Sequence, residues 1–217
     1  TVDPAPVIAA GQVKTICSGT SVAKEIFLTP LNLPLGTVFN WADPDGGGPA
    51  TGGVNVAMGV AGTLHLTDVL TNTSGAPITV TYVVTPTGGA GCVGSPQNIV
   101  ITVDPAPVIT AAQSKTICSG SAVNYKVTLT PGGAPVGTVY NWADPDGGGP
   151  ATAGVAVAES NALTITDILT HTSGSPITVT YNIIPTSGAG CVGASVNVVI
   201  TVDPAPVIAA GQVKTIC

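Results

Sequence analysis

The sequence predicts an all-β protein made of tandem β-sandwiches, and three observations support this fold class. One long segment occurs twice and then begins a third time. Apolar and polar residues alternate with a period of two in several runs of each copy, which is typical of half-buried strands. Clusters of Gly, Pro, Asn, Asp and Ser separate these runs and predict turns. No stretch shows a sustained helical period, so strands account for the whole pattern.

The internal repeat sets the expected domain organisation. The string TVDPAPVI begins at Thr1, at Thr102 and again at Thr201. We therefore expect one domain over residues 1–101, a second over 102–200, and the first strand of a further repeat over 201–217. The joining segment VDPAP contains two prolines, which favour an extended and stiff connection between copies.

The alternation is clearest in Ile78–Val84, where every second residue is apolar. Each copy contains about seven such runs, the number expected of an Ig-like sandwich of two packed sheets. The inward positions include Tyr82 and Tyr181, which we expect in the core. Trp41 and Trp142 lie on the third predicted strand, where a core position is favoured. The alternative, a sugar-stacking platform, needs a row of exposed aromatics, and aromatic residues make up only 4% of the chain.

The composition excludes several classes of function. Apolar residues make up 44% of the chain and charged residues 7%, with a net charge of −6. Nucleic acid is an unsuitable partner, because phosphate binding needs clustered Lys and Arg. Intrinsic disorder goes with low hydrophobicity and high net charge, which this chain lacks. No apolar run in the sequence is long enough to cross a bilayer.

The cysteines repeat with the copies, at Cys17, Cys92, Cys118, Cys191 and Cys217. No His or second Cys stands at metal-ligand spacing, so disulfides are favoured over a metal site. Disulfides imply an oxidising, extracellular compartment. The odd cysteine, Cys217, is expected to have its partner beyond this sequence.

The predicted strand order argues against pairing within a copy. Cys17 ends the first strand, whereas Cys92 lies in the loop between the sixth and seventh strands, at the opposite pole. Strands of this length separate the poles by roughly 30 Å, whereas a disulfide needs Cα atoms about 5.5 Å apart. We therefore expect a staple between neighbouring repeats, Cys17 with Cys191, with Cys92 bonded to an upstream copy and Cys118 to a downstream one. The alternative pairs Cys17 with Cys92 and Cys118 with Cys191, if the first strand is broken or changes sheet.

Two segments suggest a family. FNWADPDGGG at Phe39–Gly48 and YNWADPDGGG at Tyr140–Gly149 are similar to the WDFGDG-type segment of PKD domains. With ICSG, ITVTY, GCVGS and ITVDPAP, the chain resembles the PKD-like repeats of Bacteroidetes surface proteins, including gliding adhesins exported by the type IX system. PKD domains usually place an aromatic residue where this chain has Ala42, Asp43 and Pro44. The resemblance implies a cell-surface stalk or filament and supplies no catalytic residues.

The acidic loops are the only candidate metal sites. Asp43 and Asp45, with Asp144 and Asp146 in the second copy, are hard oxygen donors of the kind calcium binds. Two carboxylates are few for such a site, and three glycines follow them in each copy. An exposed turn is therefore the favoured interpretation, and no other cofactor is expected.

Catalysis has no support in the sequence. His65 corresponds to Thr164 and His171 to Asn72, so neither position requires imidazole in both copies. No Ser or carboxylate is paired with a positioned base, and we expect no enzyme.

We expect instead a structural stalk repeat on the cell surface that gives reach and stiffness. Its partners would be neighbouring repeats, with surface glycans or other cells bound by a distal tip outside this sequence. The alternative is a carbohydrate- or protein-binding module that acts through its inter-strand loops.

Overall fold

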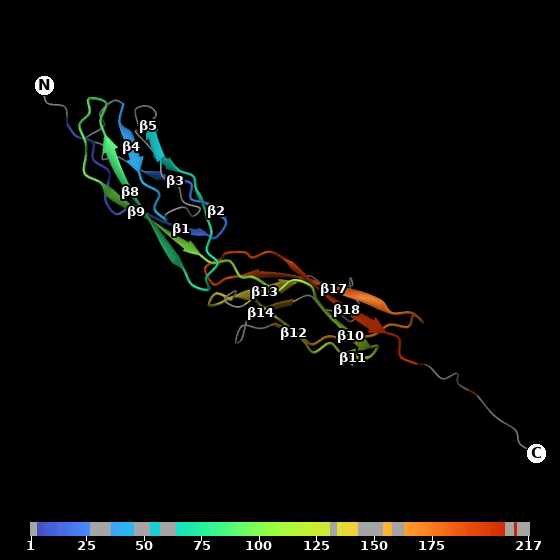
Figure 1. Ribbon diagram of the computed structural model, residues 1–217. Coiled ribbons are helices and arrows are strands. Elements are labelled where there is room, and N and C mark those ends of the chain that lie inside the picture. Colours follow the sequence, from blue (N-terminus) through green and yellow to red (C-terminus); the bar gives the residue numbers. More distant parts are fainter. Residues whose placement is uncertain are drawn as a thin grey trace, which may run out of the picture. The chain divides into compact units, whose positions relative to one another are not determined.

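The computed structural model describes residues 4–26, 36–45, 53–56, 64–130, 134–142, 154–157, 163–206 and 211, with backbone only at 25–26, 53–56 and 154–157. The chain divides into two compact units, Thr1–Ala106 (unit 1) and Pro107–Cys217 (unit 2). The regular elements of the described residues are all β-strands (Figure 1). No described segment forms a helix with the length and apolarity needed to cross a membrane.

The two units contain equivalent strands in the same order. Those of unit 1 are β1 (Val13–Cys17), β2 (Thr20–Ser21), β3 (Lys24–Ile26), β4 (Val38–Trp41), β5 (Gly53–Val56), β6 (Leu64–Leu66), β7 (Val69–Leu70), β8 (Ile78–Thr87) and β9 (Gln97–Asp104). Those of unit 2 are β10 (Gln113–Cys118), β11 (Ser121–Ala122), β12 (Tyr125–Val127), β13 (Val139–Trp142), β14 (Gly154–Val157), β15 (Leu163–Ile165), β16 (Ile168–Leu169), β17 (Ile177–Thr186) and β18 (Val196–Asp203).

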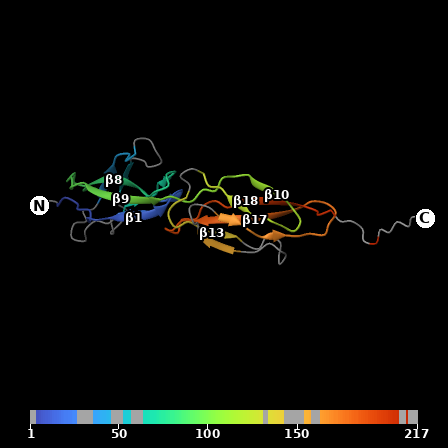
Figure 2. The ribbon, with the colours of Figure 1, turned by 90° about the horizontal axis from the view of Figure 1, so that it is seen from below.

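Each unit is a sandwich of two layers. In unit 1 a five-stranded sheet has the order β1-β9-β8-β4-β5, and the opposite layer consists of the pairs β2–β7 and β3–β6. In unit 2 the five-stranded sheet has the order β10-β18-β17-β13-β14, opposite the pairs β11–β16 and β12–β15. Figure 2 shows β1, β9 and β8 side by side in one layer. The arrangement confirms the predicted tandem of Ig-like sandwiches.

The period-two alternation explains which side chains form the core. On β8, Tyr82 and Val84 are fully buried, while Val83 between them is exposed. Phe39 on β4 is also fully buried, and Trp41, two residues further on the same face, packs against the same cluster while only half-buried. Unit 2 has an equivalent cluster that includes Tyr140 and Tyr181, with Trp142 packed against it.

The first segment of each domain changes sheet, which the alternation does not reveal. In unit 2, Ile109 forms a bridge with Leu129, which follows β12. The chain then bends and continues as β10, which pairs in parallel with β18. Ala112 at the bend has φ 58°, in the left-handed region, and Gly11 at the equivalent position of unit 1 has φ 71°. A single continuous strand cannot serve two sheets, so this break is the physical condition for the parallel pairing.

A buried glutamine compensates for the break. The side chain of Gln113 donates hydrogen bonds to the carbonyls of Thr110, at 2.7 Å, and Thr128, at 2.9 Å. Its Oε1 accepts a 2.8 Å hydrogen bond from the Thr128 amide. The side chain therefore satisfies backbone groups that a continuous ladder would have paired. Gln12 occupies the same place in unit 1 and donates to the Ala9 carbonyl at 3.0 Å.

The sequence repeat and the structural unit are out of phase. The last strand of unit 1, β9, continues to Asp104, so the repeat that begins at Thr102 starts inside this strand. Likewise residues 201–203 belong to β18 of unit 2. Of the expected first strand of a third repeat, residues 207–210 and 212–217 lie outside the described residues.

Candidate functional site

The cysteines at the ends of the domains are the side chains most able to do chemistry, and the strand register fixes where two of them lie. Cys17 is the last residue of β1 and pairs with Asp104, the last residue of β9. The parallel ladder continues into a 2.8 Å hydrogen bond from the Ser18 amide to the Asp104 carbonyl. Cys118 pairs with Asp203 in the same way in unit 2. Each therefore lies at the end from which the chain leaves its domain, here called the outgoing end.

The other two cysteines lie in the loop that joins the two longest strands. Cys191 lies between β17 and β18, where its amide donates a 3.1 Å hydrogen bond to Ser187 Oγ. The Ser187 amide donates to the Cys191 carbonyl at 2.9 Å, so the loop is a closed turn that buries this cysteine. Cys92 has the same place between β8 and β9, where its carbonyl accepts from the Gly88 amide at 2.9 Å.

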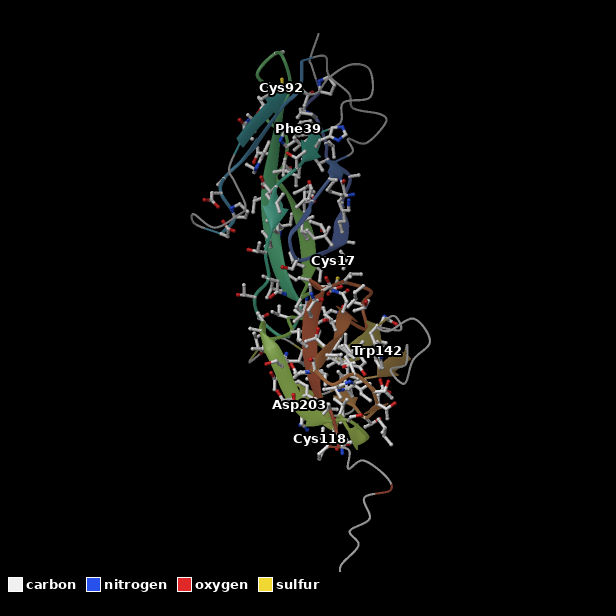
Figure 3. The ribbon with its side chains drawn as sticks, turned by 90° about the vertical axis from the view of Figure 1, so that its right-hand side faces the viewer. Cys17, Phe39, Cys92, Cys118, Trp142 and Asp203 are labelled. Atoms are coloured by element: carbon white, nitrogen blue, oxygen red, sulfur yellow. The ribbon has the colours of Figure 1, made fainter. Side chains whose placement is uncertain are left out.

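The loop cysteine and the strand cysteine of one domain lie at opposite ends. In unit 1, β9 begins at Gln97, just after the loop of Cys92, and ends beside Cys17. Eight residues of strand separate these points, a length of about 26 Å. Figure 3 shows the two labelled cysteines at the two ends of unit 1. The change of sheet does not remove this separation, because after the break β1 still runs parallel to β9.

The loop packs against the segment that enters the domain. A Cβ added to Gly193, two residues after Cys191, would overlap the carbonyl oxygen of Pro107 and crowd the Pro185 ring. Gly94 stands in the same relation to Pro6 in unit 1. The loop cysteine therefore marks the end at which the chain enters, here called the incoming end.

The cysteines differ in redox state. Cys17 and Cys191 are disulfide-bonded. Cys92 is a half-buried thiol and Cys118 an exposed one. Pairing inside each copy, Cys17 with Cys92 and Cys118 with Cys191, is therefore not formed in this structure, because each pair would consume one of these thiols. Cys217 lies outside the described residues.

The acidic loop forms a local turn. The amide of Asp45 donates a 3.1 Å hydrogen bond to Asp43 Oδ1, an Asx turn in which the carboxylate serves its own backbone. The described residues contain no group of three or more His, Cys, Asp or Glu arranged to hold a metal ion. Asp144 and Asp146 lie outside the described residues. Calcium-dependent melting remains the test of cation binding by these loops.

The core tyrosines have partners that sequence reasoning missed. Tyr82 donates a 2.7 Å hydrogen bond to Asp68 Oδ2, and Tyr181 donates one of the same length to Asp167 Oδ2. Burial raises the pKa of Tyr82 well above its usual value, and the hydrogen bond to Asp68 and the negative charge of that carboxylate raise it further. The aspartate precedes its tyrosine by the same number of residues in both copies. This equal spacing is the one feature of the sequence that could have indicated the pair.

The lysine that precedes each strand cysteine by three residues also has a structural role. Lys14 Nζ donates to the Ala23 carbonyl at 2.8 Å, and Lys115 Nζ to the Val123 carbonyl at 2.7 Å. These carbonyls belong to the bend before β3 and β12, in the opposite layer. The ammonium groups therefore close the open edge of each sandwich between its first strand and the second layer.

Comparison with known proteins identifies a family. A model of the PKD-like domain matches residues 14–107 and again residues 115–206. No curated protein matches the chain. The domain that this model describes is of a non-catalytic type.

Solved structures of tandem β-domains are similar at low sequence identity. DIP-gamma IG1+IG2 is 14% identical, with 93% of this chain and 99% of that chain covered and a TM-score of 0.40. The I-band fragment I67–I69 from titin is also 14% identical, with 92% of this chain and 66% of that chain covered and a TM-score of 0.45. A structure of the fibronectin(III)-like modules of Clostridium thermocellum CbhA is 10% identical, with 96% of this chain and 100% of that chain covered and a TM-score of 0.32.

PKD-like and Ig-like domains in tandem are typical of extracellular multidomain proteins, and the disulfide-bonded cysteines agree with an oxidising environment. The family model covers well over half of the chain with two successive matches, the first in unit 1 except for its last residue and the second in unit 2. The chain therefore belongs to the PKD-like domain family, of which it contains two tandem members.

Proposed function

We propose that this chain is a structural spacer of an extracellular surface stalk or filament, in which each joint between domains is closed by a disulfide. The observation that carries the proposal is the place of the cysteines: one at the outgoing end and one at the incoming end of every domain. A binding module has no need of cysteines at both poles, whereas a chain of domains that must keep its joints closed does.

The proposed staple joins Cys17 to Cys191. Cys17 lies beside Asp104, and the loop of Cys191 packs on Pro107 through Gly193. Only three peptide links separate Asp104 from Pro107, so their Cα atoms are at most about 11 Å apart in any conformation. A linker this short would allow the two cysteines to reach each other, and both are disulfide-bonded.

The same pairing extends along a longer array. By the repeat, Cys92 would bond the strand cysteine of a preceding copy, and Cys118 and Cys217 would bond the loop cysteines of following copies. Each linker would then be part of a covalent loop that the disulfide closes, and bending at the joint would be suppressed. Stiffness between domains is the property that a stalk needs in order to hold a distal part away from the surface.

A non-reducing peptide map tests the pairing. The protein is alkylated, digested at acidic pH to prevent exchange, and analysed by mass spectrometry. We expect a peptide that contains Cys17 linked to one that contains Cys191. A peptide with Cys17 linked to Cys92 would contradict the staple.

Small-angle scattering tests the mechanical role. The Cys17→Ser/Cys191→Ser variant should populate a broader range of overall dimensions than the native chain, because only the linker remains at the joint. Cys118→Ser is the matched control, since it removes a thiol without opening this joint. An unchanged distribution in the double variant would reject the role of the disulfide in stiffness.

The assignment to a particular class of surface protein rests on the resemblance of sequence segments to PKD-like repeats. We propose that the stalk belongs to a Bacteroidetes cell-surface adhesin of the gliding type, exported by the type IX system, with surface glycans or other cells bound at a distal tip. Supporting it are the ICSG, ITVTY and GCVGS segments and the tandem of PKD-like domains. Immunolabelling of the native protein on intact cells would test this assignment, and an intracellular location would reject it.

A further inference from the structure

The five-stranded sheet of each unit has a side that faces away from the core, here called the outer face. In unit 1 it comprises every second residue of Thr79–Thr87, Asn98–Thr102 and Val13–Thr15, together with Val38 and Asn40. Cross-strand pairing aligns these side chains in rows, such as Thr15, Thr102 and Thr79. The outer face is therefore a regular array of short side chains.

None of these outer-face residues is charged, in either unit. The copies differ there by exchanges among uncharged residues: Val13 becomes Ser114, Val83 becomes Asn182 and Thr85 becomes Ile184. Several of the apolar members are open to solvent, with exposed fractions of 66% for Val13, 50% for Val83 and 39% for Ile184.

Three of the described charged residues of unit 1 lie away from the outer face. Lys14 reaches from the edge of the sheet to the opposite layer, Lys24 lies in that layer, and Asp68 bonds the core tyrosine. Asp104 follows Thr102 on the same side of β9 and is charged, but it lies at the outgoing end, beyond the outer face as defined here. In a protein with a net charge of −6, the outer face is thus a described surface through which two copies can meet with little electrostatic repulsion.

The size of the face bears on how strongly it can bind. The four strands that carry it, from β1 across to β4, present roughly 400 Å² in one unit, given the usual rise and spacing of strands. A stable protein interface buries about 800 Å² on each partner. One outer face is therefore too small for a tight contact, so the association that it supports is weak.

We propose that the outer face is a lateral docking surface for a second copy of this chain. Two such sheets pack face to face about 10 Å apart. Val13 and Val83 lose their contact with water there, and the threonine rows present methyl and hydroxyl groups that suit a close, uncharged contact. This contact lies along the sides of the domains and is independent of the disulfide at their ends.

Sedimentation equilibrium of the alkylated chain, from micromolar to millimolar concentration, tests the proposal. Alkylation caps the thiols, so covalent dimers cannot contribute. We expect the average mass to rise from 21.1 kDa toward twice that value. The variant Val83→Lys/Asn182→Lys places a charge at the centre of each outer face, and it should weaken the dimer at least about tenfold by like-charge repulsion.

The matched control is Thr67→Lys/Thr166→Lys, which adds the same charge at exposed positions between the strands of the opposite layer. It should leave the dissociation constant within about twofold of the native value. Circular dichroism establishes that both variants fold. A native chain that stays at 21.1 kDa throughout, or a control that weakens association as much as the outer-face variant, overturns the proposal.

Discussion

Tyr82 and Asp68 form a 2.7 Å hydrogen bond that ties the central strand β8 to the opposite layer, between β6 and β7. The Asp68 carbonyl also accepts a 2.7 Å hydrogen bond from the Val22 amide. The bonded pair therefore joins both layers of the sandwich at a point where the tyrosine ring is fully buried.

Tyr82→Phe should lower the free energy of unfolding of unit 1 by about 2 kcal/mol, because it removes a hydrogen bond to a carboxylate. Fluorescence of Trp41, in a background in which Trp142 is Phe, reports unit 1 during urea unfolding. Tyr125→Phe is the control, since this tyrosine belongs to unit 2 and packs against the core of that unit while only partly buried. A loss below about 0.5 kcal/mol would show that the pair contributes little.

The same tyrosine makes unit 1 sensitive to alkali. The pKa of Tyr82 is raised in the folded state, mainly by burial, above the 10.0 of an unperturbed tyrosine. Its contribution to stability is therefore complete below about pH 10 and is lost as the pH rises further, since the unfolded chain releases the proton first. Urea unfolding between neutral pH and strong alkali should show this decline, and Tyr82→Phe should make it shallower. An equal slope in the variant would contradict the assignment.

Tyr140 and Phe39 occupy equivalent positions but differ by one hydroxyl. The Tyr140 hydroxyl is buried and has no hydrogen-bond partner among the described residues. Tyr140→Phe should therefore leave unit 2 unchanged or stabilise it by up to about 1 kcal/mol, and Phe39→Tyr should destabilise unit 1 by about 1–3 kcal/mol. Thermal unfolding of both variants checks the pair, and a marked loss from Tyr140→Phe would reveal a partner for this hydroxyl.

His171 replaces an asparagine that is fully bonded in unit 1. Asn72 donates to the carbonyls of Ala76 and Val103, both at 2.8 Å, and accepts from Ser74. In unit 2 the Ser173 hydroxyl donates to the Ser175 carbonyl, so it accepts from His171 Nδ1, and Nε2 is left buried without a partner within the described part of the chain.

His171→Asn should therefore stabilise unit 2 by about 1 kcal/mol, since asparagine restores the bonds seen in the other copy. Urea unfolding monitored through Trp142, in a background in which Trp41 is Phe, measures the change. The reverse exchange, Asn72→His, should destabilise unit 1. If both exchanges were neutral, the loop would not depend on these side-chain bonds.

Gly193→Ala tests the packing of the incoming segment. The added methyl group would overlap the Pro107 carbonyl, so the loop or the segment must move, and we expect a loss of about 2 kcal/mol or more. Gly174→Ala is the matched control, because its Cβ would meet open space and its backbone is not left-handed. Hydrogen exchange of the loop amides would locate the disturbance, and equal stability of the two variants would show that the contact is not tight.

The sequence predicted those features that period-two alternation encodes directly. Alternation places Tyr82 and Tyr181 on the inward side of their strands, and both are fully buried. It does not state which strand is the neighbour, so the change of sheet at Gly11 and Ala112 and the buried Gln113 were missed. The repeat gave the period but not the phase, because any residue of a periodic string can be taken as its start. The end of β9 at Asp104 fixes that phase.

The hydrogen-bonded partners of the core tyrosines were also beyond the sequence. Asp68 and Asp167 read as ordinary turn residues, and only the folded chain brings them beside tyrosines from another strand. The separation of Cys17 from Cys92, in contrast, followed from counting strands, because each strand reverses the direction of the chain.

The parallel pairing of β1 with β9 determines how each domain responds to tension. A pull on the chain draws the start of β1 toward one pole and the end of β9 toward the other. Their ladder, from Val13 beside Val100 to Cys17 beside Asp104, is then loaded in shear. Hydrogen bonds loaded in this way must yield together rather than one after another, so the first and last strands act as a clamp that protects the rest of the sandwich from extension.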